Sequence, residues 1–162
     1  YIMDWDNGIC LRLATVFGSS PRMRTDLLVN DFVYKAMSQD CLVLFQSHFK
    51  RNYIHVRDIA YTFLHCIENY DKLNGEVFNV GLSNANLNKM ELAKTIKMYF
   101  PYLVILENEF GKDIDNRNYI VSNDKLEATG WLPRYTIEDG IEELMSAYQM
   151  IITDNNKKYT NL

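Results

Sequence analysis

The chain has 162 residues, 48% of them hydrophobic and 23% charged, a composition that favours one folded domain over disorder. Its net charge of −4 argues against the broad basic surface of a nucleic-acid-binding protein. No apolar run approaches the roughly 20 residues of a membrane-spanning helix, and 3 cysteines without a C-x-x-C spacing argue against disulfides and zinc. We expect a cytoplasmic protein with reduced thiols.

The first elements predict a parallel sheet. Residues 9–16 are almost all apolar, as in a strand covered on both faces, and Gly18 ends that strand in a turn. A loop over 19–24 leads to a helix over 25–39, whose apolar residues recur at helical spacing. Residues 41–45 then predict a short buried strand.

The middle of the chain alternates extended and helical segments. Residues 53–55 are a brief extended piece, and Asp58 is placed to cap the helix that follows. The inward face predicted for that helix comprises Ile59, Phe63, Ile67 and Tyr70. A strand over 76–80 precedes a helix that begins at Asn88 with Glu91 as its capping partner, has Leu92 and Ile96 inward, and stops before Pro101.

The last third of the chain completes an α/β pattern. A strand is predicted over 104–106, residues 119–121 are compatible with another, and residues 123–129 form a short helix. Thr136 and Asp139 open the last long helix. Its predicted inward face is Ile137, Ile141, Leu144, Tyr148 and Ile151. Because strands and helices interleave, we expect one α/β unit over residues 1–153 and a polar tail over 154–162.

Four motifs occur in a fixed order along the chain. Residues 51–58 read Arg-Asn-Tyr-Ile-His-Val-Arg-Asp, close to the pattern Arg-Asp-[Tyr/Phe]-[Ile/Val]-[His/Tyr]-Val-x-Asp. Residues 11–18, 75–81 and 123–133 are similar to Leu-Arg-x-x-Asn-x-Tyr-Gly, Gly-x-x-[Tyr/Phe]-Asn-[Val/Leu]-Gly and Asp-x-x-Lys-x-x-x-x-Gly-[Phe/Trp]-x-Pro. Together they resemble the second half of the extended short-chain dehydrogenase/reductases, the nucleotide-sugar epimerases and dehydratases. The implied fold is the C-terminal, substrate-binding part of an extended Rossmann-type enzyme.

The resemblance implies a set of substrate-binding residues. Arg51 takes the position of the family's diphosphate-binding arginine, and a guanidinium suits two phosphate oxygens. Thr15 stands where the family has a substrate-contacting Asn. The loop and helix that border the substrate contribute Arg22, Arg24 and Asn30. A late basic loop, similar to Arg-Pro-Gly-Asp-x-Arg, contributes Lys112 and Arg117.

These assignments have structural alternatives. Thr15 packing within its turn is as compatible with the pattern as a substrate contact. Arg22 and Arg24, taken singly, are compatible with a solvated loop. Asp58 fits a helix cap better than a catalyst, and His55 fits a packed structural histidine better than a titrating one.

The groups that carry the family's chemistry do not occur in this sequence. None of its 7 glycines forms G-x-G-x-x-G or G-x-x-G-x-x-G, and no Tyr-x-x-x-Lys is present. Tyr1 is not an initiator methionine and no signal-peptide pattern follows it, so we expect a chain that starts inside a longer gene product. No catalytic residue is assigned, and this chain is predicted to be inactive by itself.

The resemblance also implies what the intact enzyme does. It would bind NAD or NADP outside this chain, act by hydride transfer on a nucleoside-diphosphate sugar, and form a homodimer. The sequence leaves open which sugar, base and cofactor it uses, and whether it is an epimerase, dehydratase or reductase. A non-catalytic α/β ligand-binding or interaction domain is the alternative. A metal-dependent hydrolase is disfavoured because no His/Asp cluster has ligand spacing.

Overall fold

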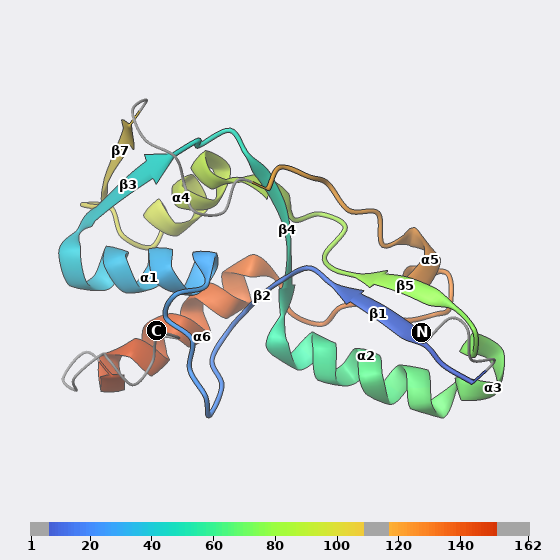
Figure 1. Cartoon of the computed structure of the whole chain (residues 1–162). Helices are drawn as coiled ribbons and strands as arrows, with labels where there is room; N and C mark the ends of the chain where they lie inside the picture. The colour runs from blue at the N-terminus through green and yellow to red at the C-terminus, as the bar shows by residue number, and fades with distance from the viewer. Residues whose placement is uncertain (1–6, 109–116, 152–162) are drawn as a thin grey trace.

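The computed structural model describes residues 7–108 and 117–151, which form interleaved strands and helices (Figure 1). The strands are β1 (Cys10–Leu13), β2 (Thr15–Phe17), β3 (Cys41–Phe45), β4 (Lys50–His55), β5 (Val77–Val80), β6 (Asn86–Asn88) and β7 (Val104–Asn108). The helices are α1 (Leu28–Gln39), α2 (Val56–Glu68), α3 (Tyr70–Leu73), α4 (Lys89–Lys97), α5 (Asp124–Glu127) and α6 (Ile137–Ile151). The predicted α/β class is confirmed.

The strands pair in three small groups, mostly in parallel. β1 pairs with β5, β2 with β4, and β3 with β7, all parallel, while β6 pairs antiparallel with the first half of β4. The single strand predicted over 9–16 is divided, because the chain leaves β5 at Ala14 and joins β4. The Ala14 N–H still donates to the Val80 carbonyl at 2.9 Å before the change of partner.

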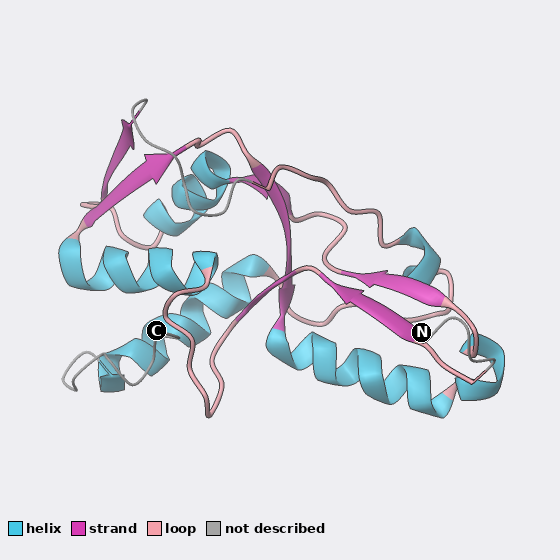
Figure 2. Cartoon of the chain, in the orientation of Figure 1, coloured by secondary structure: helices cyan, strands magenta, loops and turns pink. Residues whose placement is uncertain are grey.

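Strand β4 lies at the centre of the molecule. In Figure 2 it passes between one group of helices, α1, α4 and α6, and a second group, α2, α3 and α5. Tyr53 and Ile54 on this strand are fully buried. A strand buried on both faces with helices to either side is what the parallel pairing requires.

Helices α1 and α6 pack against each other and hold much of the core. The inward face predicted for α6 is confirmed at its four described members, Ile137, Ile141, Leu144 and Tyr148, which are at most 4% exposed. The Tyr148 hydroxyl also donates to the Asn30 carbonyl at 3.0 Å. Helix α1 starts at Leu28 rather than at residue 25.

Two of the three helix starts that were predicted from capping residues are confirmed, those of α4 and α6. In α4, the Glu91 N–H donates to Asn88 Oδ1 at 2.8 Å and the Asn88 N–H donates to Glu91 Oε2 at 2.7 Å. In α6, the Asp139 N–H donates to Thr136 Oγ1 at 3.1 Å and the Thr136 N–H donates to Asp139 Oδ2 at 2.8 Å. Leu92 is buried on α4, as predicted.

Helix α2 differs from the prediction in its orientation and in its cap. Its buried residues are Asp58, Ile59, Thr62 and Cys66, whereas Phe63 is 51% exposed and Ile67 is 69% exposed. The Asp58 carboxylate accepts the N–H groups of Arg134 and Tyr135 at 2.9 and 3.1 Å, which turns that face of the helix inward. Asp58 is therefore not the cap. His55 caps the helix instead, through Nδ1, which accepts the Arg57 N–H at 3.2 Å.

Other differences concern short polar segments. Strand β6, Asn-Leu-Asn, was not predicted because asparagine is depleted in strands, and β4 is longer than its predicted apolar part. Residues 119–121 form no strand, although the Tyr119 N–H donates to the Lys50 carbonyl at 3.2 Å. The tail over 154–162 lies outside the described residues. No described helix is long and apolar enough to cross a membrane.

Candidate functional site

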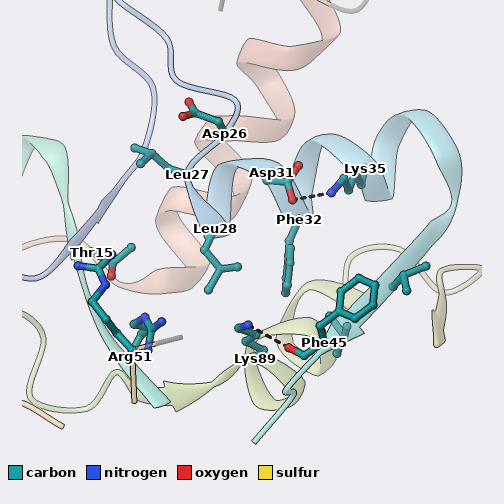
Figure 3. A pocket seen from close by; sticks show the side chains of 13 residues that line it. Thr15, Asp26, Leu27, Leu28, Asp31, Phe32, Lys35, Phe45, Arg51 and Lys89 are labelled. Carbon is teal, nitrogen blue, oxygen red and sulfur yellow. Dashed lines mark hydrogen bonds and ion pairs between the residues drawn. The ribbon is translucent and has the colours of Figure 1, made fainter. Parts of the chain in front are cut away.

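A pocket of about 310 Å³ opens between α1, β3, the start of β4 and the start of α4 (Figure 3). Its walls combine apolar and charged side chains. They are Thr15, Asp26, Leu27, Leu28, Asp31, Phe32, Lys35, Val43, Leu44, Phe45, Arg51, Lys89 and Arg117. Among these described lining residues, four side chains are basic and two are acidic, which gives them a formal charge of +2 in a chain whose net charge is −4. The pocket is therefore suited to an anion.

Arg51 is the most deeply placed guanidinium of the pocket. It is 3% exposed, and its place in the first half of β4 pairs its backbone with Leu87 of β6. Nη1 donates to the Lys50 carbonyl at 3.1 Å, and the guanidinium carbon lies 5.4 Å from the centre of the Tyr119 ring. These contacts orient the guanidinium, which lowers the entropy lost when a ligand binds it.

Lys89 is a second buried cation of this pocket. The antiparallel pairing of β4 with β6 places Lys50 opposite Asn88, so the next residue, Lys89, begins α4 close to Arg51. Lys89 is 2% exposed, and its Nζ donates to the Phe45 carbonyl at 2.9 Å, as Figure 3 shows. Sequence reasoning missed this residue, because its place depends on the unpredicted strand β6.

The α1 side of the pocket carries the carboxylates. Asp31 accepts from Lys35 Nζ at 2.8 Å, an (i, i+4) pair along the helix. Asp26 accepts from Arg24 through both carboxylate oxygens, at 2.7 and 2.6 Å, and this hydrogen bonding lowers the pKa of Asp26. Each of these two carboxylates is therefore paired with a cation near the start of α1.

Three of the residues predicted to bind substrate line this pocket together: Thr15, Arg51 and Arg117. They come from β2, β4 and the segment after residue 116, so the fold brings distant parts of the chain to one place. Arg22 and Arg24 lie outside the lining. Lys112 lies outside the described residues.

Asn30, also predicted to bind substrate, lies outside the pocket lining, where it ties the preceding loop to α1. Its Oδ1 accepts the Gly18 N–H at 3.1 Å, and its Nδ2 donates to the carbonyls of Gly18 and Arg24 at 3.2 and 2.8 Å. It is 1% exposed. All of these contacts are to backbone, so its side chain sets the path of the loop next to the pocket.

A second polar cluster, around His55, is part of the core. The ring is fully buried, packs edge-on against Phe17 and stacks on Tyr135. Burial lowers the pKa of His55, and the neighbouring carboxylate of Glu143, 3.5 Å from Nε2, only partly offsets it. His55 is therefore a packed structural histidine, as predicted.

Glu143 joins this cluster to the loop after β2. Burial alone would raise its pKa, but hydrogen bonds from the Ser19 hydroxyl and N–H hold the pKa of Glu143 below its usual value. Arg57 Nη2 lies 3.0 Å from the other carboxylate oxygen. The cluster fastens α6 to that loop.

The described residues do not fit a nicotinamide dinucleotide. Such cofactors place their pyrophosphate at a helix N-terminus that follows a glycine-rich turn. Here one N–H group in the first turn of each of α2, α4 and α6 is already taken, by the side chains of His55, Asn88 and Thr136 respectively. Helix α1 follows Asp26 and Leu27 rather than glycine. Among the described residues, no group of His, Cys, Asp or Glu could hold a metal ion.

Comparison with known proteins relates the first half of this chain to an epimerase/dehydratase family. Residues 4–81 match the NAD dependent epimerase/dehydratase family. An uncharacterised protein of Schizosaccharomyces pombe is 29% identical over 61% of this chain and 32% of its own length. The chain thus spans about a third of that curated relative.

Solved structures show the same fold. UDP-glucose 4-epimerase of Thermotoga maritima, solved with UDP-glucose, has a TM-score of 0.75 at 23% identity, over 90% of this chain and 47% of that one. dTDP-glucose 4,6-dehydratase of Bacillus anthracis, solved with NAD, has a TM-score of 0.70 at 22% identity, over 90% of this chain and 46% of that one. The resemblance to the extended short-chain dehydrogenase/reductases is confirmed, and the chain spans about half the length of these structures.

Proposed function

We propose that this chain is the nucleotide-sugar-binding part of an NAD(P)-dependent epimerase or dehydratase, and that the pocket beside Arg51 holds the diphosphate. The observation that carries the proposal is the burial of Arg51 in a lining of charge +2. A nucleoside-diphosphate sugar carries two negative charges on its diphosphate, so ligand and lining are complementary in charge.

The apolar wall fits the rest of such a ligand. Leu28 and Phe32 lie across the pocket from Arg51 and Lys89 in Figure 3, and with Phe45, which lies beside Lys89, they offer contact area to a base or sugar ring. Thr15 at the start of β2 supplies a hydroxyl for a hydrogen bond to a sugar or phosphate oxygen. The matched solved structures include one with UDP-glucose and another with UDP-glucuronic acid and NAD.

The chemistry is assigned to residues beyond those described. The cofactor, NAD or NADP, supplies hydride transfer, and since the described residues do not fit a dinucleotide, we propose that another part of the parent enzyme holds it. The contribution of this chain is to bind and orient the nucleotide sugar and to keep its diphosphate in a fixed position. We propose a cytoplasmic, homodimeric parent.

The test is calorimetric titration of the 162-residue chain with UDP-glucose. Arg51→Ala should weaken binding by about 1.5–3 kcal/mol, the range for a hydrogen bond to a charged group, which is about 10- to 150-fold in Kd. Arg51→Lys should recover part of the loss, because an ammonium keeps the charge but loses the two-pronged geometry.

The exposed Arg134 provides a matched control, because its guanidinium lies over the Tyr61 ring, 3.9 Å from its centre, outside the pocket lining. Arg134→Ala should leave the affinity unchanged. The proposal would be contradicted if wild type and both Arg51 variants bound UDP-glucose with equal affinity. It would also be contradicted if a nucleoside without phosphates bound as tightly as UDP-glucose. A chain that binds no nucleotide would favour an interaction domain.

A further inference from the structure

We propose that Lys89 is a second direct ligand of the diphosphate, and that with Arg51 it sets the preference of this pocket for two phosphates over one. This inference rests on the proposed function. It assigns a binding role to a residue that none of the family-like motifs contains. Its measurable consequence is that the affinity of the pocket depends on the number of phosphates in the ligand.

The burial of Lys89 is the first observation. Lysine is rarely buried, because removing an ammonium from water is costly unless polar partners surround it. Lys89 is 2% exposed, yet its side chain reaches the wall of a pocket rather than the apolar core. Its Nζ donates to the Phe45 carbonyl at 2.9 Å. That contact holds the ammonium in place at the pocket.

The position of Lys89 in its helix is the second observation. It is the first residue of α4, where the partial positive charge of the helix disfavours a cation and favours an acid. The capping box of Asn88 and Glu91 already stabilises this helix start without it. Helix stability therefore does not account for a lysine here, whereas an anion in the pocket would be attracted by the ammonium.

The third observation is the arrangement of the cations. Arg51 comes from β4, and Lys89 begins the helix that follows β6, the antiparallel neighbour of β4. Both line the same pocket, and Figure 3 shows them along its lower wall, opposite Leu28. Two cations on adjoining elements match the two phosphates of a diphosphate, where one cation would be enough for a monophosphate.

The experiment compares Lys89→Met and Lys89→Arg with wild type by calorimetric titration against UDP, UMP, uridine and inorganic pyrophosphate. Methionine keeps the length of the stem and removes the charge. We expect Lys89→Met to bind UDP and pyrophosphate at least about tenfold more weakly, to lose less on UMP, and to leave uridine unchanged. The salt dependence of UDP binding should also become shallower. Lys89→Arg should retain most of the UDP affinity.

The control is Lys94→Met, a charge removal at an exposed position of the same helix, which should change none of these affinities. Circular dichroism melting verifies that each variant is folded. A loss that is equal for UDP, UMP and uridine would overturn the inference, since it would mean that Lys89 only supports Phe45. Unchanged UDP binding by Lys89→Met, with Arg51→Ala impaired, would overturn it while the proposed function stands. If wild type binds neither UDP nor pyrophosphate, both fail.

Discussion

Replacing Asn30 by alanine should destabilise the protein more than any comparable polar substitution on its surface. The side chain makes three hydrogen bonds to backbone, at 2.8, 3.1 and 3.2 Å, and is 1% exposed. Each such bond contributes about 0.5–1.5 kcal/mol net, and truncation leaves the N–H and C=O of Gly18 without these partners in a buried place. The expected loss in the free energy of unfolding is about 2–4 kcal/mol.

The assay is urea denaturation followed by circular dichroism. With a slope of about 2 kcal/mol per molar urea, the midpoint should fall by about 1–2 M. Asn79→Ala is the matched control, because Asn79 Nδ2 makes a single exposed hydrogen bond, to the Ser122 carbonyl at 3.1 Å. That control should cost at most about 1 kcal/mol. A loss below about 0.5 kcal/mol for Asn30→Ala would refute the reasoning that Asn30 holds the loop.

Two further predictions concern the core around His55. Gly140→Ala should lower the melting temperature, because the new Cβ would lie 2.1 Å from Phe17 Cε2. The cost of this overpacking, about 1–3 kcal/mol, outweighs the roughly 1 kcal/mol that alanine gains in helix propensity. A higher melting temperature would contradict this packing. The unfolding free energy of wild type should fall as the pH drops from 7 to 5.5, because burial lowers the pKa of folded His55 and the unfolded chain takes up the proton first, near pH 6.5. The unfolding free energy of His55→Phe should depend less on pH between 7 and 5.5, a range over which Glu143, with its lowered pKa, stays ionised. His48→Gln is the control and should keep the pH dependence of wild type. If His55→Phe and wild type have the same pH dependence, the effect belongs to another group.

Local chemistry made some elements predictable from the sequence. The capping boxes at 88–91 and 136–139 depend only on residues within one helical turn, and both were predicted correctly. The four described inward residues of α6 follow one unambiguous apolar stripe. Arg51 could be singled out because it starts a motif of fixed spacing, and the structure places it in the pocket.

Tertiary contacts decided the rest. Helix α2 has apolar residues on two faces, and periodicity alone could not show that Asp58 would turn one of them inward by accepting two backbone N–H groups from residues 134 and 135. Lys89 was missed because β6 is short and polar, and its pairing with β4 is a long-range event. Only that pairing brings the lysine to Arg51.

The most direct measurement is the set of backbone amide shifts in a ¹⁵N–¹H spectrum of the chain as UDP is added. The largest changes should fall on Thr15, Arg51 and Lys89, the pocket residues from β2, β4 and α4. The amides around His65, in the cavity lined by α2 and residues 130–134, should not move. Shifts confined to that cavity, or no shifts at millimolar UDP, would contradict a diphosphate site at Arg51.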